Sequence, residues 1–165
     1  MKKAADITTK HLCPGCKWTF SNKKLTNNKQ PFVKRQGPRI RAGVCMYCPK
    51  EDKLLVVQAY NEFVGLPKGG QEVGETTPQT ALRELFEETG VHIAAVDESK
   101  SVIMHRSCTY YIVEVESTDS MYPIALHEFP DNDVSGAGWV HLDCICKLPG
   151  RTTSHLDSIL KMLKR

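Results

Sequence analysis

Three glutamates lie close together in the sequence, at a spacing that suits metal chemistry. An α-helix turns about 100° per residue, so positions three and four apart share one face. On such a helix Glu84, Glu87 and Glu88 fall within one arc. The opposite arc is apolar and consists of Ala81, Leu82, Leu85 and Phe86. Three carboxylates repel one another unless a positive charge lies among them, and Mg²⁺ or Mn²⁺, which prefer oxygen ligands, would supply it. The alternative is an ordinary solvated acidic helix.

The residues around these glutamates are typical of a helix with a defined start and end. Thr77 can cap the amino end, and Pro78 suits the first helical position. Gly90 is placed to form a left-handed cap at the carboxyl end. In the preceding loop, Glu75 is placed to pair with Arg83 of the helix. We expect a structural role for this pair, in which Arg83 serves the catalytic site by orienting the carboxylates.

The complete pattern resembles the Nudix box, glycine-x5-glutamate-x7-arginine-glutamate-hydrophobic-x-glutamate-glutamate-x-glycine-hydrophobic. The matching positions, without a departure, are Gly69, Glu75, Arg83, Glu84, Leu85, Glu87, Glu88, Gly90 and Val91. The resemblance implies the Nudix fold, an α/β/α sandwich with a mixed sheet, and cleavage of a diphosphate linkage by water and Mg²⁺ or Mn²⁺. It further implies Glu84 and Glu88 as metal ligands, Glu87 as a further ligand or base, and the main-chain carbonyl of Gly69 as another ligand.

Further site residues are predicted outside the box. Lys68, at its start, and Arg41, on the first predicted strand, could each reach a substrate phosphate or equally be a surface charge. Many Nudix proteins place another acidic residue between the later strands. Glu128 is the preferred candidate here, because Asp131 and Asp133 are more typical of a turn.

A set of strands and a terminal helix must position these residues. The predicted strands cover 39–48, 53–60, 91–96, 102–108, 109–115 and 138–142, with a turn at 49–52. A helix over 154–164 has an apolar face and a capping box formed by Ser154 and Asp157. Trp139 is predicted to be a core residue. Mixed strands around a central helix, with a second helix at the end, favour an α/β sandwich.

Length and composition limit the class of protein. The chain has 165 residues, of which 41% are hydrophobic and 25% charged, as expected of one globular domain. Its apolar runs are far too short to span a membrane, and no apolar stretch near the amino terminus resembles a secretory signal. Seven cysteines, an odd number, favour free thiols in a reducing compartment, cytoplasmic or nuclear. The sequence does not indicate an oligomeric state.

Charge is distributed unevenly along the chain. Residues 1–41 hold eleven Lys or Arg and one acidic residue, whereas the remainder holds eleven basic and eighteen acidic residues. We therefore expect a basic N-terminal arm over 1–38, ahead of a hydrolase domain over 39–165. A basic arm beside an acidic metal site favours a polyanionic substrate such as RNA, a nucleotide or a polyphosphate. The alternative is a solvated leader without a role in binding.

Two CxxC pairs suggest a second metal site. Cys13 and Cys16 could bind one structural zinc ion together with Cys45 and Cys48, which would make the arm part of a small zinc element. Against this, the second pair lies on the first predicted strand, where positions three apart point to opposite faces. The alternative is a pair of buried thiols and an untethered turn. The remaining cysteines, predicted to be core or surface thiols, are Cys108, Cys144 and Cys146.

Residues 66–70, Leu-Pro-Lys-Gly-Gly, give an indication of the substrate class. This segment is similar to the start of the box in diadenosine polyphosphate hydrolases, diphosphoinositol polyphosphate phosphohydrolases and mRNA-decapping Nudix enzymes. It implies capped RNA ends or dinucleoside polyphosphates as substrates, with diphosphoinositol polyphosphates as the alternative. Cap binding needs an aromatic platform, for which the candidates are Trp18, Phe20, Tyr47 and Phe63. A non-catalytic binding module remains an alternative of another class, although the complete box favours catalysis.

Overall fold

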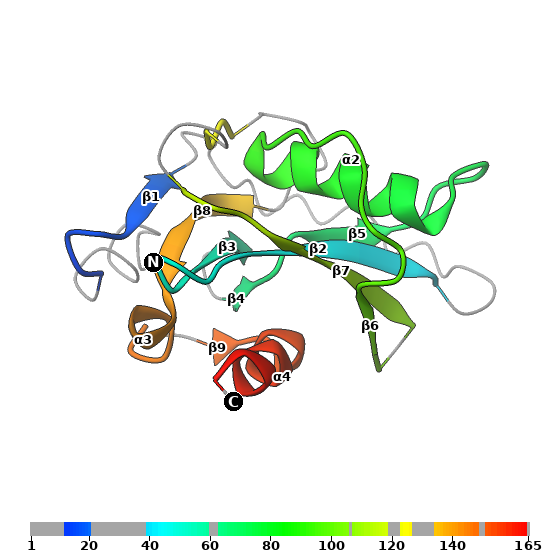
Figure 1. Ribbon diagram of the computed structural model, residues 1–165. Coiled ribbons are helices and arrows are strands. Elements are labelled where there is room, and N and C mark those ends of the chain that lie inside the picture. Colours follow the sequence, from blue (N-terminus) through cyan, green and yellow to red (C-terminus); the bar gives the residue numbers. More distant parts are fainter. Residues whose placement is uncertain are drawn as a thin grey trace.

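The computed structural model describes residues 12–20, 39–59, 63–105, 107–118, 123–126, 134–148 and 151–164, and its strands form one mixed sheet with helices on both sides (Figure 1). The strands are β1 (Lys17–Phe20), β2 (Arg41–Cys48), β3 (Lys53–Ala59), β4 (Phe63–Gly65), β5 (Lys68–Gly70), β6 (Ser101–Met104), β7 (Cys108–Glu114), β8 (Val134–His141) and β9 (Arg151–Thr152). The helices are α2 (Thr77–Thr89), α3 (Leu142–Ile145) and α4 (Ser154–Leu163). The predicted α/β/α sandwich is thereby confirmed.

The sheet follows the order β1-β8-β3-β2-β7-β6. Its centre is mixed, since β2 runs parallel to β7 and antiparallel to β3. The short strand β5 is antiparallel to the start of β2, with Arg41 opposite Gly70 and Gly43 opposite Lys68. This pairing sets the glycines that precede the acidic helix against a central strand.

An apolar core lies on each side of the sheet. Along β3, Leu55 packs into the core under α2, whereas Leu54 and Val56 pack into the core under α4, as the alternation of side chains along a strand requires. Trp139 is 1% exposed, so the prediction that it is a core residue is confirmed. The apolar face of α4 is also confirmed, because its buried residues include Leu156, Ile159 and Leu160.

The structure corrects the predicted start of the acidic helix by one residue. Thr76, not Thr77, is the cap, because its side chain accepts a hydrogen bond from the Gln79 main-chain N–H and its own N–H donates to the Gln79 side chain. Pro78 is thus the second helical residue. Gly90 has φ of 76° and forms the predicted left-handed cap. Phe86, predicted to be on the apolar face, is 37% exposed.

Other local predictions are wrong or incomplete. Residues 91–96 form no strand. The cap of α4 is Thr153, whose hydroxyl accepts a hydrogen bond from the Leu156 N–H, so Ser154 and Asp157 form no capping box. The elements that were not predicted are β1, β4, β5, β9 and α3. All of these are short, and β1, β5 and β9 form only by pairing with strands that are distant in the sequence.

The predicted four-cysteine zinc site is wrong. Cys45 and Cys48 are both buried on β2, and they belong to the cores on opposite sides of the sheet. Their thiols therefore cannot converge on one ion. Within the described residues, the side chains that do gather are Cys13, Cys16, His141 and Cys144. Cys144 is therefore more than the core thiol that we predicted.

All seven cysteines are free thiols. None of the helices in the described ranges is long and apolar enough to cross a membrane.

Candidate functional site

The guanidinium of Arg83 is the centre of the acidic site. Its Nε and Nη2 donate to the two carboxylate oxygens of Glu75 at 2.7 and 3.0 Å, which confirms the predicted contact between the loop and the helix. Nη1 donates to Glu84 at 2.9 Å and to Glu87 at 3.1 Å. Nη2 also donates to the carbonyl of Gly70, at 2.8 Å. One cation thus ties together the loop, the helix and β5.

Electrostatics keep this centre charged. The pKa of Glu75 is lowered to about 2, mainly by the hydrogen bonds from Arg83, which outweigh the opposing effect of burial. The N–H of Glu72 and the hydroxyl of Thr80 lower this pKa further. The same pairing raises the pKa of Arg83 above its ordinary value. Glu75 and Arg83 therefore form an ionised strut at any pH near neutrality.

Glu84 is more enclosed than Glu87. Its side chain is 14% exposed, and burial raises its pKa, although Arg83 opposes the rise. A Cβ atom at Gly69 would collide with the Glu84 carboxyl group. Only glycine at this position lets the carboxylate lie against the backbone of β5.

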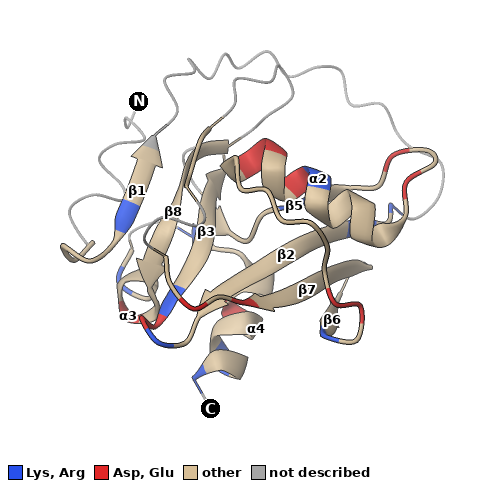
Figure 2. Cartoon of the chain, turned by 45° about the horizontal axis from the view of Figure 1, so that its top comes forward, with Lys and Arg blue, Asp and Glu red and all other residues tan. Residues whose placement is uncertain are grey.

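Glu88 and Glu87 continue the acidic face toward β5. The main-chain N–H of Lys68 donates to Glu88 Oε2 at 3.1 Å. Glu87 is more exposed, with 36% of its side chain accessible, and is held at the rim by Arg83. Figure 2 shows the acidic positions of α2 in red, with a basic position in blue beside them. The three carboxylates therefore lie on the side of the helix that faces β5.

The arrangement fits a hard divalent cation. The donors on this face are carboxylate oxygens. Gly69 has no side chain, so the main chain of β5 can lie close to Glu84; we call this contact the glycine cradle. Arg83 contacts Glu84 and Glu87, but its charge does not fully offset the effect of burial, and the pKa of Glu84 is therefore raised. A second positive charge would stabilise the ionised form of that carboxylate. The residues that could hold Mg²⁺ or Mn²⁺ are Gly69, Glu84, Glu87 and Glu88.

Lys68 and Arg41 lie near one another beside this face. Arg41 and Gly43 occupy the same side of β2, and a Cβ on Gly43 would be 2.8 Å from the Cβ of Lys68. The pKa of His155 is lowered first by burial and then by the charges of His105, Lys68 and Arg41. Lys68 and Arg41 thus lie close enough to α4 for their charges to lower the pKa of His155. The main-chain N–H of Lys68 contacts Glu88, and a phosphate-binding role for the two cations stays a prediction.

A histidine and tyrosine cluster in this region was not anticipated. Nδ1 of His155 is 2.8 Å from the hydroxyl of Tyr110, and the rings of His155 and His105 lie edge to face with centroids 4.8 Å apart. These residues come from β6–β7 and α4 and are about 50 positions apart in the sequence. No local pattern connects them, so only the folded sheet reveals the cluster.

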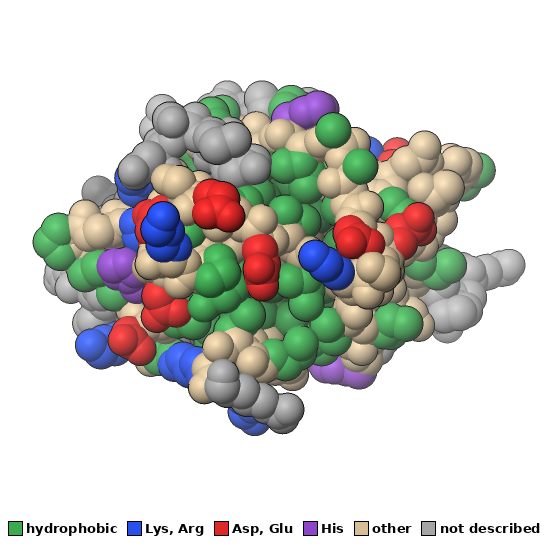
Figure 3. Space-filling view, viewed as in Figure 1, with side chains coloured by type: hydrophobic (Ala, Val, Ile, Leu, Met, Phe, Trp, Pro, Cys, Tyr) green, Lys and Arg blue, Asp and Glu red, His purple; other side chains and the backbone are tan. Residues whose placement is uncertain are grey.

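Several predicted site residues cannot be placed. Glu128, Asp131 and Asp133 lie outside the described residues, as does most of the basic arm. On the face shown in Figure 3, acidic and basic side chains of the described residues are interspersed with hydrophobic ones.

The aromatic candidates for a cap platform are scattered. Tyr47 lies six residues beyond Arg41 on β2, about 20 Å along the strand, where its hydroxyl donates to Asp52. Trp18 lies on β1 at the opposite edge of the sheet from β6 and β7, and Phe63 is half-buried on β4. The side chain of Phe20 is outside the described set. These three described aromatic residues lie on three different strands, and none of them lies on the acidic helix α2.

Comparisons with known proteins agree with this geometry. The family model described as NUDIX domain matches residues 37–162. The curated protein "Putative hydrolase 111R" of Invertebrate iridescent virus 3 is 36% identical over 119 residues, which are 72% of this chain and 64% of the viral protein. More than a third of that relative therefore has no counterpart in the match.

Two solved structures show the same fold. A bifunctional NMN adenylyltransferase/ADP ribose pyrophosphatase from Francisella tularensis, complexed with AMP and a Mn ion, has a TM-score of 0.61 at 19% identity, over 82% of this chain and 43% of the other. The NUDIX domain of Shewanella oneidensis NrtR, complexed with ADP ribose, has a TM-score of 0.59 at 21% identity, over 84% of this chain and 94% of that one. At these identities the likeness concerns the fold alone.

Proposed function

This chain belongs to the Nudix family, and on that premise we propose that it is a metal-dependent pyrophosphohydrolase that cleaves a diphosphate linkage in a nucleotide-type polyanion. One observation carries the proposal: Arg83, locked to Glu75, holds Glu84 and Glu87 in place on the side of α2 that faces β5. Because the guanidinium of Arg83 already orients these carboxylates, they can bind a second cation, the metal ion, without rearranging. An acidic helix with a purely structural role would not need the glycine cradle that receives Glu84.

The ligands proposed for Mg²⁺ or Mn²⁺ are the carboxylates of Glu84, Glu87 and Glu88 and the main-chain carbonyl of Gly69. When bound there, a divalent cation supplies charge neutralisation at the phosphate oxygens and a lower pKa for a bound water. The protein contributes orientation. Arg83 fixes two of the carboxylates, and the Lys68 N–H fixes Glu88. Preorganised groups of this kind need no rearrangement when charge develops on the phosphate.

Removal of a proton from water is assigned to the acidic residues. Glu87, the more exposed of the helix carboxylates that Arg83 contacts, is proposed as a ligand or as the base. Glu128 is proposed as an additional acidic group at the site.

Nucleotide-type substrates are favoured by the cations beside the acidic face. Arg41 of β2 and Lys68 of β5 are proposed to bind phosphate groups on the side of the sheet that carries both residues. AMP and ADP ribose in the two similar structures are nucleotides. The Lys-Gly-Gly start of the box and the basic arm favour longer polyanions over mononucleotides. We therefore propose capped RNA ends or dinucleoside polyphosphates as the substrates.

A hydrolysis panel tests the proposal. The full chain is incubated with capped RNA, diadenosine polyphosphate and diphosphoinositol polyphosphate, each at low concentration with Mg²⁺ or Mn²⁺. Capped RNA or diadenosine polyphosphate should be hydrolysed fastest. Preference for the inositol compound would overturn the nucleotide assignment. No turnover of any of the three would favour a binding module, and nucleotide binding measured by calorimetry would then identify it.

A further inference from the structure

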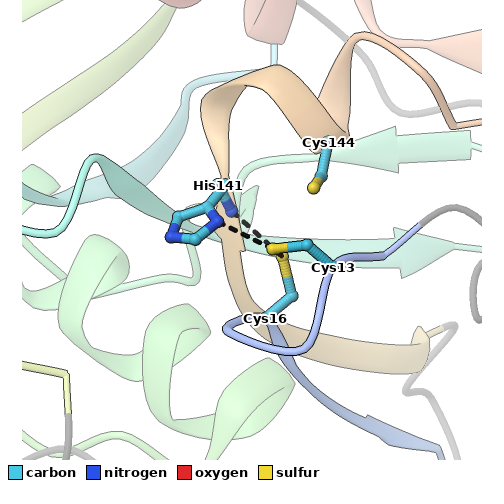
Figure 4. A group of neighbouring side chains, drawn as sticks. All are labelled: Cys13, Cys16, His141 and Cys144. Carbon is cyan, nitrogen blue, oxygen red and sulfur yellow. Dashed lines mark hydrogen bonds between the residues drawn. The ribbon is translucent and has the colours of Figure 1, made fainter.

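Four metal-ligating side chains from distant parts of the chain meet beside the end of β8 (Figure 4). Their ligand atoms all lie within 4.8 Å of one another. Cys13 Sγ is 3.6 Å from Cys16 Sγ and 2.9 Å from His141 Nδ1. Cys144 completes the group from α3, and it is the only buried member of the four.

These separations suit a tetrahedral ion. Zinc bonds of about 2.3 Å to sulfur and about 2.0 Å to nitrogen place tetrahedral ligands about 3.5–3.8 Å apart. The sulfur–sulfur distance of 3.6 Å lies within that range, whereas the sulfur–nitrogen distance of 2.9 Å lies below it and the upper limit of 4.8 Å above it. Small shifts of side chains would be enough to close the shell. A disulfide between Cys13 and Cys16 would instead need the sulfurs about 2 Å apart.

The fold builds this site through sheet pairing. β1 is antiparallel to β8, with Lys17 opposite Trp139 and Trp18 opposite Gly138. Two residues further along this register, Gly15 comes opposite His141. The main chain there is tightly packed, because a Cβ on Gly15 would be 2.9 Å from the His141 ring.

Backbone hydrogen bonds support the cysteine turn. The N–H of Cys16 donates to the carbonyl of Cys13 at 3.0 Å, which closes the turn. The N–H of His141 donates to the sulfur of Cys16 at 3.3 Å. Such N–H···S contacts orient and stabilise thiolate ligands. α3 starts directly after His141, so Cys144 follows three residues later on the same side of the helical turn.

The surroundings of Cys13 differ from those of the buried Cys45 on β2. Burial in the apolar core raises the pKa of Cys45 to about 12. Burial would also raise the pKa of Cys13, but its hydrogen bonds with Cys16, the Gly15 backbone, His141 and Cys144 outweigh that effect and lower the pKa to about 6. Burial raises the pKa of Cys16 to about 12.

We propose that Cys13, Cys16, His141 and Cys144 form a structural zinc site that fastens the segment over 12–20 to the end of β8. Three sulfurs and one imidazole nitrogen select zinc over Mg²⁺ or Mn²⁺. Four protein ligands leave no open position, so the site stabilises the fold and takes no part in hydrolysis. The proposal is independent of the substrate, since it uses none of the residues of the acidic site.

Metal analysis of matched cysteine variants tests the site. The full chain is produced with zinc in the medium, purified without chelators, and its bound zinc is measured by mass spectrometry of the elements. Wild type and Cys146→Ser should each retain about one zinc per chain, and Cys144→Ser should lose it. Cys146 is a suitable control, because it lies two residues further on and is exposed. Zinc-free wild type, or equal retention by Cys144→Ser, would overturn the proposal.

Cobalt substitution of the wild type keeps the test valid if Cys144→Ser does not fold. Co²⁺ in a site of three thiolates and one imidazole should give a thiolate-to-metal charge-transfer band and the intense visible bands of a tetrahedral ion. Zinc added in stoichiometric amount should remove these bands. Weak visible bands without charge transfer would show that the ion is bound by oxygen ligands, and the sulfur site would then be rejected.

Discussion

The two candidate metal sites of this protein differ in their donors and in how the chain assembles them. The acidic site takes its residues from one continuous segment, 69–91, and offers oxygen atoms. The sulfur site joins Cys13 to Cys144 across most of the chain and offers sulfur and nitrogen. A turn of helix creates the first, whereas the pairing of β1 with β8 creates the second.

The difference extends to charge compensation. The acidic site contains its own cation, since Arg83 hydrogen-bonds to three carboxylates. It can therefore hold its shape while a metal ion exchanges. In the sulfur site, hydrogen bonds join the ligands to one another and to the His141 N–H. We expect the acidic site to govern turnover and the sulfur site to govern stability.

The largest predicted effect is the loss of hydrolysis in Glu88→Gln. The amide keeps the size of the side chain but removes the charge that the cation requires, so kcat should fall on the order of 10³-fold. Steady-state hydrolysis of the best substrate measures it. Zinc content should stay at the wild-type level, which separates the two sites. Glu98→Gln, an exposed control outside α2, should keep its activity. Undiminished turnover in Glu88→Gln would remove Glu88 from the list of ligands.

Gly69→Ala tests the contact between β5 and the helix. The added methyl group would collide with the Glu84 carboxyl group and displace it. A displacement of about 1 Å can reduce turnover about 10²-fold. Gly74→Ala is the comparison, because nothing lies within 4 Å of its Cβ position but φ is +85°. That variant should lose about 1 kcal/mol of stability and keep its turnover. Equal turnover in both variants would contradict the cradle at Gly69.

Cys144→Ser should reverse this pattern. Loss of a zinc ion present at a thousandfold above its Kd lowers the free energy of unfolding by about 4 kcal/mol, which corresponds to a fall in Tm of about 10 °C. Thermal unfolding with and without a zinc chelator measures this. The kcat of the folded fraction at low temperature should remain that of the wild type. An unchanged Tm would show that the sulfur site does not stabilise the fold. A large fall in kcat would show that the sulfur site and the acidic site are coupled.

Glu75→Gln tests the strut on which the acidic site depends. The pKa of Glu75 is lowered to about 2 in the folded protein from an ordinary value of 4.5. The ionised carboxylate therefore adds stability above about pH 4.5 that is lost as the pH falls toward 2. After allowance for solvent screening, we expect Glu75→Gln to cost about 1–2 kcal/mol at pH 7. Urea unfolding at several pH values measures the difference from wild type, which should shrink below pH 4.5.

Glu51→Gln is the matched control for Glu75→Gln. The pKa of Glu51 is also lowered to about 2, chiefly by the hydroxyl of Thr118, which outweighs burial, and its partners lie outside the acidic site. Its substitution should change stability with the same dependence on pH but leave turnover unchanged. Glu75→Gln should in addition lower kcat by about tenfold, because Arg83 loses its anchor. Equal kcat in the two variants would make the strut purely structural.

The acidic site could be predicted from the sequence, whereas the sulfur site could not. Helical periodicity and the box placed Glu84, Glu87 and Glu88 on one face and paired Glu75 with Arg83, because every interaction there spans at most 20 residues. The sulfur site was missed for the opposite reason. The spacing from His141 to Cys144 is a visible H-x2-C signal, but only the register of β1 against β8 brings it to the CxxC at 13–16. For the CxxC on β2 the argument from strand alternation is confirmed, because Cys45 and Cys48 lie in different cores.

The smallest predicted effect concerns the basic arm. Deleting residues 1–36 would remove positive charge and would also remove Cys13 and Cys16, so substrate attraction and zinc binding would be lost together. Replacing Lys23, Lys24, Lys29, Lys34 and Arg35 by glutamine lowers the net charge by five and keeps both cysteines. If the arm attracts long polyanions, KM for capped RNA should rise about threefold to tenfold at low salt, with kcat and zinc content unchanged. KM for diadenosine polyphosphate serves as the internal control and should change little, because a short substrate does not reach along the arm. A rise that persists at high salt would point to altered folding, and an unchanged KM would leave Lys68 and Arg41 as the phosphate-binding cations.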